Sequence, residues 1–200
     1  MTEPARTAPS IPWRKTRFGF VAFIALSLLA GWTVLRGVLF AKFAGDDTSF
    51  GELARLVLTG FQRDLFMSLL YALPWLGWFI LLRDRAFGKT WHRWLFTAAV
   101  FAFMSWQIFQ LAIEYYFFEE FRSRFNTVAV DYLIYPHEVF VNIGESYPVI
   151  PIVSACVILG AAWTWLARWL CRPMWTDSAP LGKRFFHCVG ALALALGLAV

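Results

Sequence analysis

Five long apolar stretches, separated by polar segments, dominate the pattern of the chain. They cover about residues 18–40, 65–82, 94–118, 149–170 and 185–200. A helix rises about 1.5 Å per residue, so about 20 apolar residues cross the roughly 30 Å hydrocarbon layer of a membrane. The pattern therefore predicts an all-α fold, a polytopic membrane helical bundle of five spans, preceded by a polar arm over residues 1–17.

The first stretch has to be distinguished from a signal peptide, and the last stretch is shorter than an ordinary span. The first is longer than the roughly 7–15 apolar residues of a signal peptide, and no Ala-x-Ala site follows it, so it predicts an uncleaved anchor. The last has 16 residues and is still apolar at Val200. We expect that the chain is cut inside or just after its fifth span; the alternative is an oblique span.

The composition excludes an ordinary soluble protein. Hydrophobic residues make up 60% of the chain and aromatic residues 19%, against about 45–50% apolar residues in soluble domains. A net charge of +5 is compatible with nucleic-acid binding. However, no basic stripe is interleaved with exposed aromatic residues, so we expect no nucleic-acid partner. The three cysteines follow no metal-binding or redox spacing.

The distribution of lysine and arginine predicts the orientation. In a five-span arrangement, twelve of the 18 basic residues fall on the side of the amino terminus, and most acidic residues fall on the other side. Because loops rich in lysine and arginine stay in the cytoplasm, the amino-terminal arm is predicted to be cytoplasmic and the carboxyl terminus to lie outside.

The first outer segment contains a helix signal. Ser49-Phe50-Gly51-Glu52 is a capping-box pattern, and Gly60 is a natural helix end, so we expect a short amphipathic helix on the outer surface before the second span. A plain connecting loop is the alternative.

The second outer segment, residues 119–147, predicts a pair of short amphipathic helices. Its apolar residues recur at helical spacing, with a polar face beside them, and Pro136 suits the first turn of a new helix. The apolar face comprises Val128, Tyr132, Tyr135, Val139 and Ile143, and the polar face Asp131, Glu138, Asn142 and Glu145. Such helices lie at the level of the lipid headgroups.

The same segment resembles a loop of one enzyme family, the lipoteichoic-acid-synthase-like phosphoglycerol transferases, which are sulfatase-type members of the alkaline phosphatase superfamily. A weaker likeness is Gly60-Phe61-Gln62-Arg63-Asp64-Leu65, which is similar to a Gly-x-Arg-x-Asp-Leu pattern of that family with the arginine one place late. The residues of the loop that carry the resemblance are Arg124, Phe125, Asn126, Asp131, Tyr132, Tyr135, Glu138, Asn142, Glu145, Ser146, Tyr147 and Pro148.

The resemblance implies a membrane anchor of a bacterial inner-membrane enzyme. Members of the family have five spans and then an extracytoplasmic catalytic domain, which uses a threonine nucleophile and a divalent metal (Mn or Mg) to transfer phosphoglycerol from a lipid headgroup. None of that domain lies in these 200 residues, so we expect no catalytic residue here. The implied partners are membrane lipids, including an anionic phospholipid, and the chain's own catalytic domain.

Polar residues near the outer ends of the spans form the candidate binding site. Charges inside a membrane are costly, so they pair with one another or extend to the surface. The candidate residues are Arg36, Arg63, Asp64, Gln110 and Glu114. One hypothesis is that they line a recess for an anionic lipid headgroup; the alternative is purely structural pairing.

Two further possibilities complete the sequence-based predictions. His137, Glu138 and Asp131 do not match the spacing of a metal motif, so we expect no metal site. The alternative function is a free-standing small transporter or assembly subunit, because transporters place broken helices at mid-membrane, and Pro74 with Gly77 is the one candidate break in the second span.

Overall fold

The computed structural model describes residues 15–43, 50–124, 136–176 and 181–199, and these are almost entirely helical, with no strand among them. Four helices contain a stretch long and apolar enough to cross a membrane, and a shorter apolar helix follows them. The long helices are α1 (Arg17–Phe43), α2 (Phe50–Leu81), α4 (Thr90–Phe121) and α7 (Val149–Leu170), and the shorter one is α8 (Leu181–Ala199). The predicted all-helical class is confirmed, and the apolar helices favour a membrane protein.

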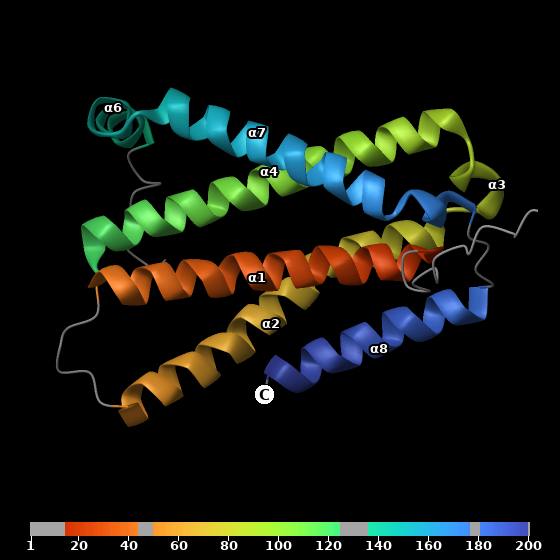
Figure 1. Ribbon diagram of the computed structural model, residues 1–200, viewed down its shortest axis with the longest axis horizontal. Helices are drawn as coiled ribbons and strands as arrows, with labels where there is room; N and C mark the ends of the chain where they lie inside the picture. Colours follow the sequence, from red (N-terminus) through yellow and green to blue (C-terminus); the bar gives the residue numbers. More distant parts are fainter. Residues whose placement is uncertain (1–14, 44–49, 125–135, 177–180, 200) are drawn as a thin grey trace, which may run out of the picture.

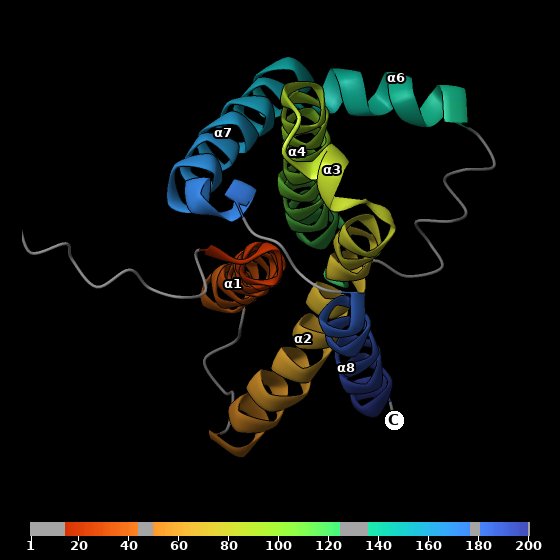
Figure 2. The same cartoon turned by 90° about the vertical axis from the view of Figure 1, so that its right-hand side faces the viewer.

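The helices run in alternating directions, so their connections gather at two ends (Figure 1). One end holds the end of α1, the start of α2 and the helix α6 (Pro136–Ser146). The other end holds α3 (Asp84–Phe87), the short 3-10 helix η3 (Arg172–Thr176) and the start of α8. The most extensive contacts are those of α4 with α7, α2 with α8, and α1 with α2, as the end-on view in Figure 2 also shows.

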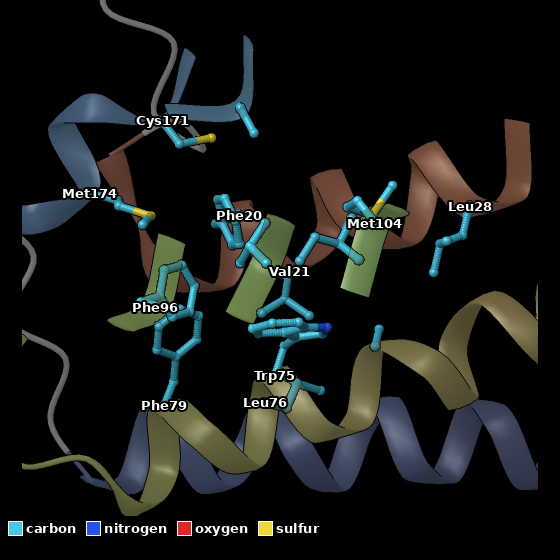
Figure 3. Close-up of a cluster of buried hydrophobic side chains, with 14 of the residues drawn as sticks. Phe20, Val21, Leu28, Trp75, Leu76, Phe79, Phe96, Met104, Cys171 and Met174 are labelled. Carbon is cyan, nitrogen blue, oxygen red and sulfur yellow. The ribbon is translucent and has the colours of Figure 1, made fainter. Parts of the chain in front are cut away.

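The apolar core joins α1, α2 and α4 and contains a group of packed aromatic rings (Figure 3). Phe20 of α1 contacts Phe96 of α4, whose ring also packs edge-on against Trp75 of α2. Offset and edge-to-face aromatic pairs add directional attraction to the burial of apolar area. Much of the outer surface is also apolar, as Ile158 and Trp165 of α7 illustrate, and a surface of this kind suits lipid contact.

The predicted separate helix in the first outer segment is wrong. Residues from Phe50 onward form one helix that continues through Gly60 to Leu81, so Gly60 is not a helix end. No described glycine has the positive φ angle that a helix-terminating glycine usually adopts, and Gly60 instead has a packing role. In the second outer segment, the predicted helix beginning at Pro136 is confirmed, and residues 125–135 lie outside the described part.

Candidate functional site: an ionic network at one end of the bundle

The centre of the site is an ion pair between α1 and α2. The guanidinium of Arg36 donates from Nε to Oδ2 of Asp64 at 3.0 Å and from Nη2 to Oδ1 at 2.8 Å. Asp64 is buried, with only 4% of its surface exposed. A two-point arginine–carboxylate contact is strong and directional, so this pair sets how α1 and α2 align along their axes.

Gly60 makes this pair sterically possible. Arg36 also donates from Nη2 to the backbone carbonyl of Gly60 at 3.1 Å. A β-carbon at position 60 would lie 2.2 Å from Cζ of Arg36, which is far inside van der Waals contact. Gly60 and Asp64 are one helical turn apart and therefore share a face, so the glycine opens the space that the guanidinium fills.

A second ion pair extends the network to α4. Arg124, just beyond the end of α4, donates from Nε to Oε1 of Glu114 at 2.6 Å, and its Nη1 lies 3.8 Å from Oδ1 of Asp64. Its guanidinium also lies 5.8 Å from the centre of the Trp32 ring. Glu114 is buried. Two guanidiniums thus balance two buried carboxylates, which avoids the high cost of a buried unpaired charge.

The structure brings together three of the five residues predicted for this site. Arg36, Asp64 and Glu114 belong to the network, whereas Arg63 is exposed on α2 and Gln110 of α4 is only partly buried, with neither joining the ion pairs. Successive helical residues point about 100° apart, so Arg63 cannot face the same neighbour as Asp64.

Sequence reasoning missed two members of the network. The sequence places Arg124 in the loop pattern but does not indicate that it pairs with Glu114, and the predicted helix end at Gly60 is instead the contact site of Arg36. The sequence feature that indicates the role of Gly60 is its four-residue spacing from Asp64. This spacing puts the glycine, which leaves room for a neighbouring side chain, on the same helix face as the carboxylate. Gln107, about two helical turns before Glu114, is buried, and its Oε1 has no hydrogen-bond partner among the described residues.

The described residues of the outer-loop pattern lie on α6 and just after it. Glu138, Asn142, Glu145 and Ser146 are exposed on α6, and Pro148 directly precedes α7. Phe125, Asn126, Asp131, Tyr132 and Tyr135 lie outside the described residues.

Tyr147 ties this segment back to the end of α4. Its hydroxyl donates to Oε2 of Glu120 at 3.4 Å, and its ring packs edge-on against that of Tyr116. Burial, and then the negative charge of Glu120, raise the pKa of Tyr147. The hydroxyl therefore stays protonated and remains a donor.

The opposite end of the bundle is held by a different set of contacts. Arg17 is buried, donates to Asp84 at 2.5 Å and lies 3.7 Å from the centre of the Phe87 ring. Beside it, the indole of Trp78 donates to Nε2 of His92 at 3.0 Å. Because an indole can only donate, Nε2 carries no proton, and Nδ1 donates to the carbonyl of Phe87 at 3.2 Å. His92 is therefore held as the neutral imidazole.

The charged groups of the network are engaged with one another. Its carboxylates are engaged by arginines, and within the described ranges no nucleophile lies in contact with a general base in it. In the same ranges no three histidine, cysteine or acidic side chains are grouped so that they could hold a metal ion.

No family model matches the sequence, and neither a curated protein nor a solved structure matches it.

Proposed function

We propose that this chain is the membrane domain of a phosphoglycerol transferase of the lipoteichoic-acid-synthase-like type, which acts on lipid headgroups outside the bacterial cytoplasmic membrane. The observation that carries the proposal is the meeting of the two segments that resemble the family. Asp64 belongs to the segment 60–65 and Arg124 begins the loop pattern, and their side chains lie 3.8 Å apart. Two stretches sixty residues apart in the sequence thus contribute to one ionic network.

The proposal includes a fifth span formed by α8. The ring of His187, the seventh residue of α8, stacks on Phe18 of α1 at 4.1 Å, and near the end of α8 the amide of Gln62 donates to the carbonyl of Leu198 at 3.1 Å. The end of α8 therefore lies beside α2, two residues before Asp64 of the ionic network. The 19 residues of α8 extend about 28 Å, of which the apolar part, Phe185–Leu198, is about 21 Å.

In this arrangement the carboxyl end of α8 and the ionic network lie on the same side of the membrane. The charge distribution of the sequence favours an extracytoplasmic location for that side. A catalytic domain that follows the spans, with its threonine nucleophile and divalent metal, would then be held over the outer leaflet, where its lipid donor is. The role of this chain is to anchor that domain and to set its height.

The alternative, a small transporter or assembly subunit, has less support. Transporters use discontinuous helices and polar groups near mid-membrane. Here α2 continues without interruption through Pro74, and the ion pairs lie toward one end of the spans and are internally balanced.

An activity measurement on the full-length protein tests the proposal. Right-side-out membrane vesicles containing phosphatidylglycerol with labelled acyl chains should accumulate labelled diacylglycerol when the protein is present with Mn²⁺, as the phosphoglycerol group passes to an acceptor, and chelation of the metal should stop the reaction. The matched variants are Arg36→Leu, which breaks the network, and Arg55→Gln, which removes an exposed arginine of the same side. Loss of turnover in the first variant alone, at equal protein levels, is expected.

Two outcomes would contradict the proposal. One is the absence of diacylglycerol release in the presence of the folded full-length protein and metal. The other concerns topology: a tag at the carboxyl end of α8 should react with an impermeant reagent in intact spheroplasts. A reaction only after permeabilisation would place that end in the cytoplasm and remove the basis for an external catalytic domain.

A further inference from the structure

Two buried polar atoms lie without a hydrogen-bond partner inside the apolar core between α2 and α4. One is the indole Nε1 of Trp75 and the other is the side-chain Oε1 of Gln107, and neither has a partner among the described residues. Trp75 is 6% exposed and Gln107 is 3% exposed, so both side chains are more than nine-tenths buried. An indole nitrogen can only donate and an amide oxygen can only accept, so the two atoms are complementary.

Contacts on either side of Gln107 place it over the junction of α1, α2 and α4. One turn before it, the centre of the Phe103 ring lies 5.3 Å from that of Trp75. One turn after it, a side-chain carbon of Leu111 lies 3.1 Å from the point where a β-carbon of Gly31 would be. Residues at i, i+4 and i+8 lie on one face of a helix, so Gln107 faces the same two neighbouring helices.

The opposite directions of α2 and α4 bring the two side chains toward each other (Figure 1). Gln107 lies one turn beyond Phe103, on the side of the ionic network. Helical side chains tilt toward the start of their own helix, so Trp75 leans toward the network and Gln107 leans away from it, back toward Trp75. Figure 3 shows this direction for Trp75, whose indole nitrogen points away from Phe96 and toward the side of Leu28.

The surroundings of the two atoms favour a small neutral ligand. The unpartnered atoms do not bond to each other directly. The nearby carboxylates of Asp64 and Glu114 are already held by Arg36 and Arg124, so the network supplies no free charge for an ion. An unpartnered polar atom is costly in an apolar interior, and a membrane offers no solvent at this depth to relieve the cost. Polar groups too far apart for a direct bond are often joined by a bridging water.

We propose that Trp75 and Gln107 bind one buried water molecule between α2 and α4. The water accepts a hydrogen bond from Nε1 of Trp75 and donates one to Oε1 of Gln107. Buried waters with two to four polar partners are integral parts of folded proteins. By joining two helices inside the core, this water fixes how α2 and α4 align along their axes, as polar contacts between helices do in membrane proteins. The site depends neither on the proposed enzyme activity nor on the membrane orientation.

Nuclear magnetic resonance on the purified full chain in deuterated micelles tests the proposal. The tryptophans are isotope-labelled at the indole nitrogen, and cross-relaxation between each indole proton and water is recorded in the rotating frame, where its sign separates a bound water from proton exchange. The chain has 11 tryptophans. The Trp75 signal is assigned by its loss in Trp75→Phe or, if that variant does not fold, by elimination from the other Trp→Phe variants.

We expect a direct cross-peak between the indole proton of Trp75 and water. Gln107→Leu removes the acceptor at nearly constant volume and should lower this peak at least about fivefold, because a water with one remaining partner is not retained. Gln110→Leu, the matched change of a partly buried glutamine on the same helix, should leave the peak unchanged. Thermal unfolding followed by circular dichroism verifies the fold of each variant, and Gln107→Met replaces Gln107→Leu if the latter does not fold.

Two results would overturn the site. One is the absence of a water cross-peak at Trp75 in the unsubstituted protein. In that case, a shift of the Trp75 indole resonance in Gln107→Leu would identify a direct bond between the two side chains instead. The other is a peak of equal size in Gln107→Leu and in the unsubstituted protein, which would show that the amide does not hold the water.

Discussion

Substitution of Gly60 by alanine tests the central contact of the ionic network through the sign of its effect on stability. An added β-carbon would lie 2.2 Å from Cζ, 2.3 Å from Nη1 and 2.5 Å from Nε of Arg36. The guanidinium therefore has to move, and Arg36 loses its bonds to Asp64 and to the carbonyl of Gly60.

Two opposing contributions determine how much Gly60→Ala changes the free energy of unfolding. Alanine is favoured over glycine in a helix by about 1 kcal/mol. Separating a buried ion pair leaves an uncompensated charge, which costs about 3–5 kcal/mol. Asp64 is buried and the side chain of Arg36 is only 17% exposed, so water compensates little of this loss. The net expectation is a destabilisation of about 2–4 kcal/mol.

The assay is reversible unfolding in mixed micelles by titration with a denaturing detergent, followed by circular dichroism. Gly77→Ala is the control, because no atom lies within 4 Å of a β-carbon there and the same helix should gain up to about 1 kcal/mol. In an Arg36→Leu background, Gly60→Ala should also become stabilising, since the obstructing guanidinium is absent.

The reasoning is refuted if Gly60→Ala stabilises the protein that retains Arg36. That result would mean that the guanidinium finds an equally good position elsewhere, and that Gly60 has no role in forming the pair.

Three further tests of other contacts use the same unfolding assay. Gly160→Ala should cost about 1–3 kcal/mol, because the new β-carbon would lie 2.9 Å from Cα of Ser105 and force α4 and α7 apart; no loss would show that these helices adjust freely. Trp78→Phe should cost about 1–3 kcal/mol by removing the donor to buried His92, whereas Trp91→Phe, at an exposed position, should be nearly neutral; equal effects would contradict the assigned bond. Asp64→Asn should cost more than Glu114→Gln, because Asp64 faces two guanidiniums and Glu114 one; the reverse order would contradict the arrangement of the network.

The positions of the long helices follow directly from the apolar stretches. The stretch 149–170 coincides with α7, and the stretches 18–40 and 94–118 lie within α1 and α4. The start of α2 was not predictable in this way, because the capping-box pattern Ser49-Phe50-Gly51-Glu52 and the helix-ending character of Gly60 predict a separate surface helix. The packing of Gly60 against Arg36, a contact between distant residues, explains why the helix can continue instead of ending there.

The sequence indicated at which level of the helices the candidate site lies, but not which residues pair in it. The position of Arg36, Asp64 and Glu114 near the ends of apolar stretches implied that they pair. Which side of each helix faces a neighbour depends on how the helices pack, so the sequence did not distinguish Asp64 from Arg63. The partner of Glu114 comes from the segment beyond α4, whose path no periodicity indicates.

The order in which the network residues emerge from the ribosome has a consequence for insertion into the membrane. Arg36 is synthesised 28 residues before Asp64, and Glu114 and Arg124 come much later. Both members of the first charge pair therefore belong to one helical hairpin, and both members of the second belong to the later segment. In the hairpin with Arg36 and Asp64, and in the segment with Glu114 and Arg124, the paired charges cancel before the two parts meet. Neither pair therefore has to enter the lipid as an unpaired charge.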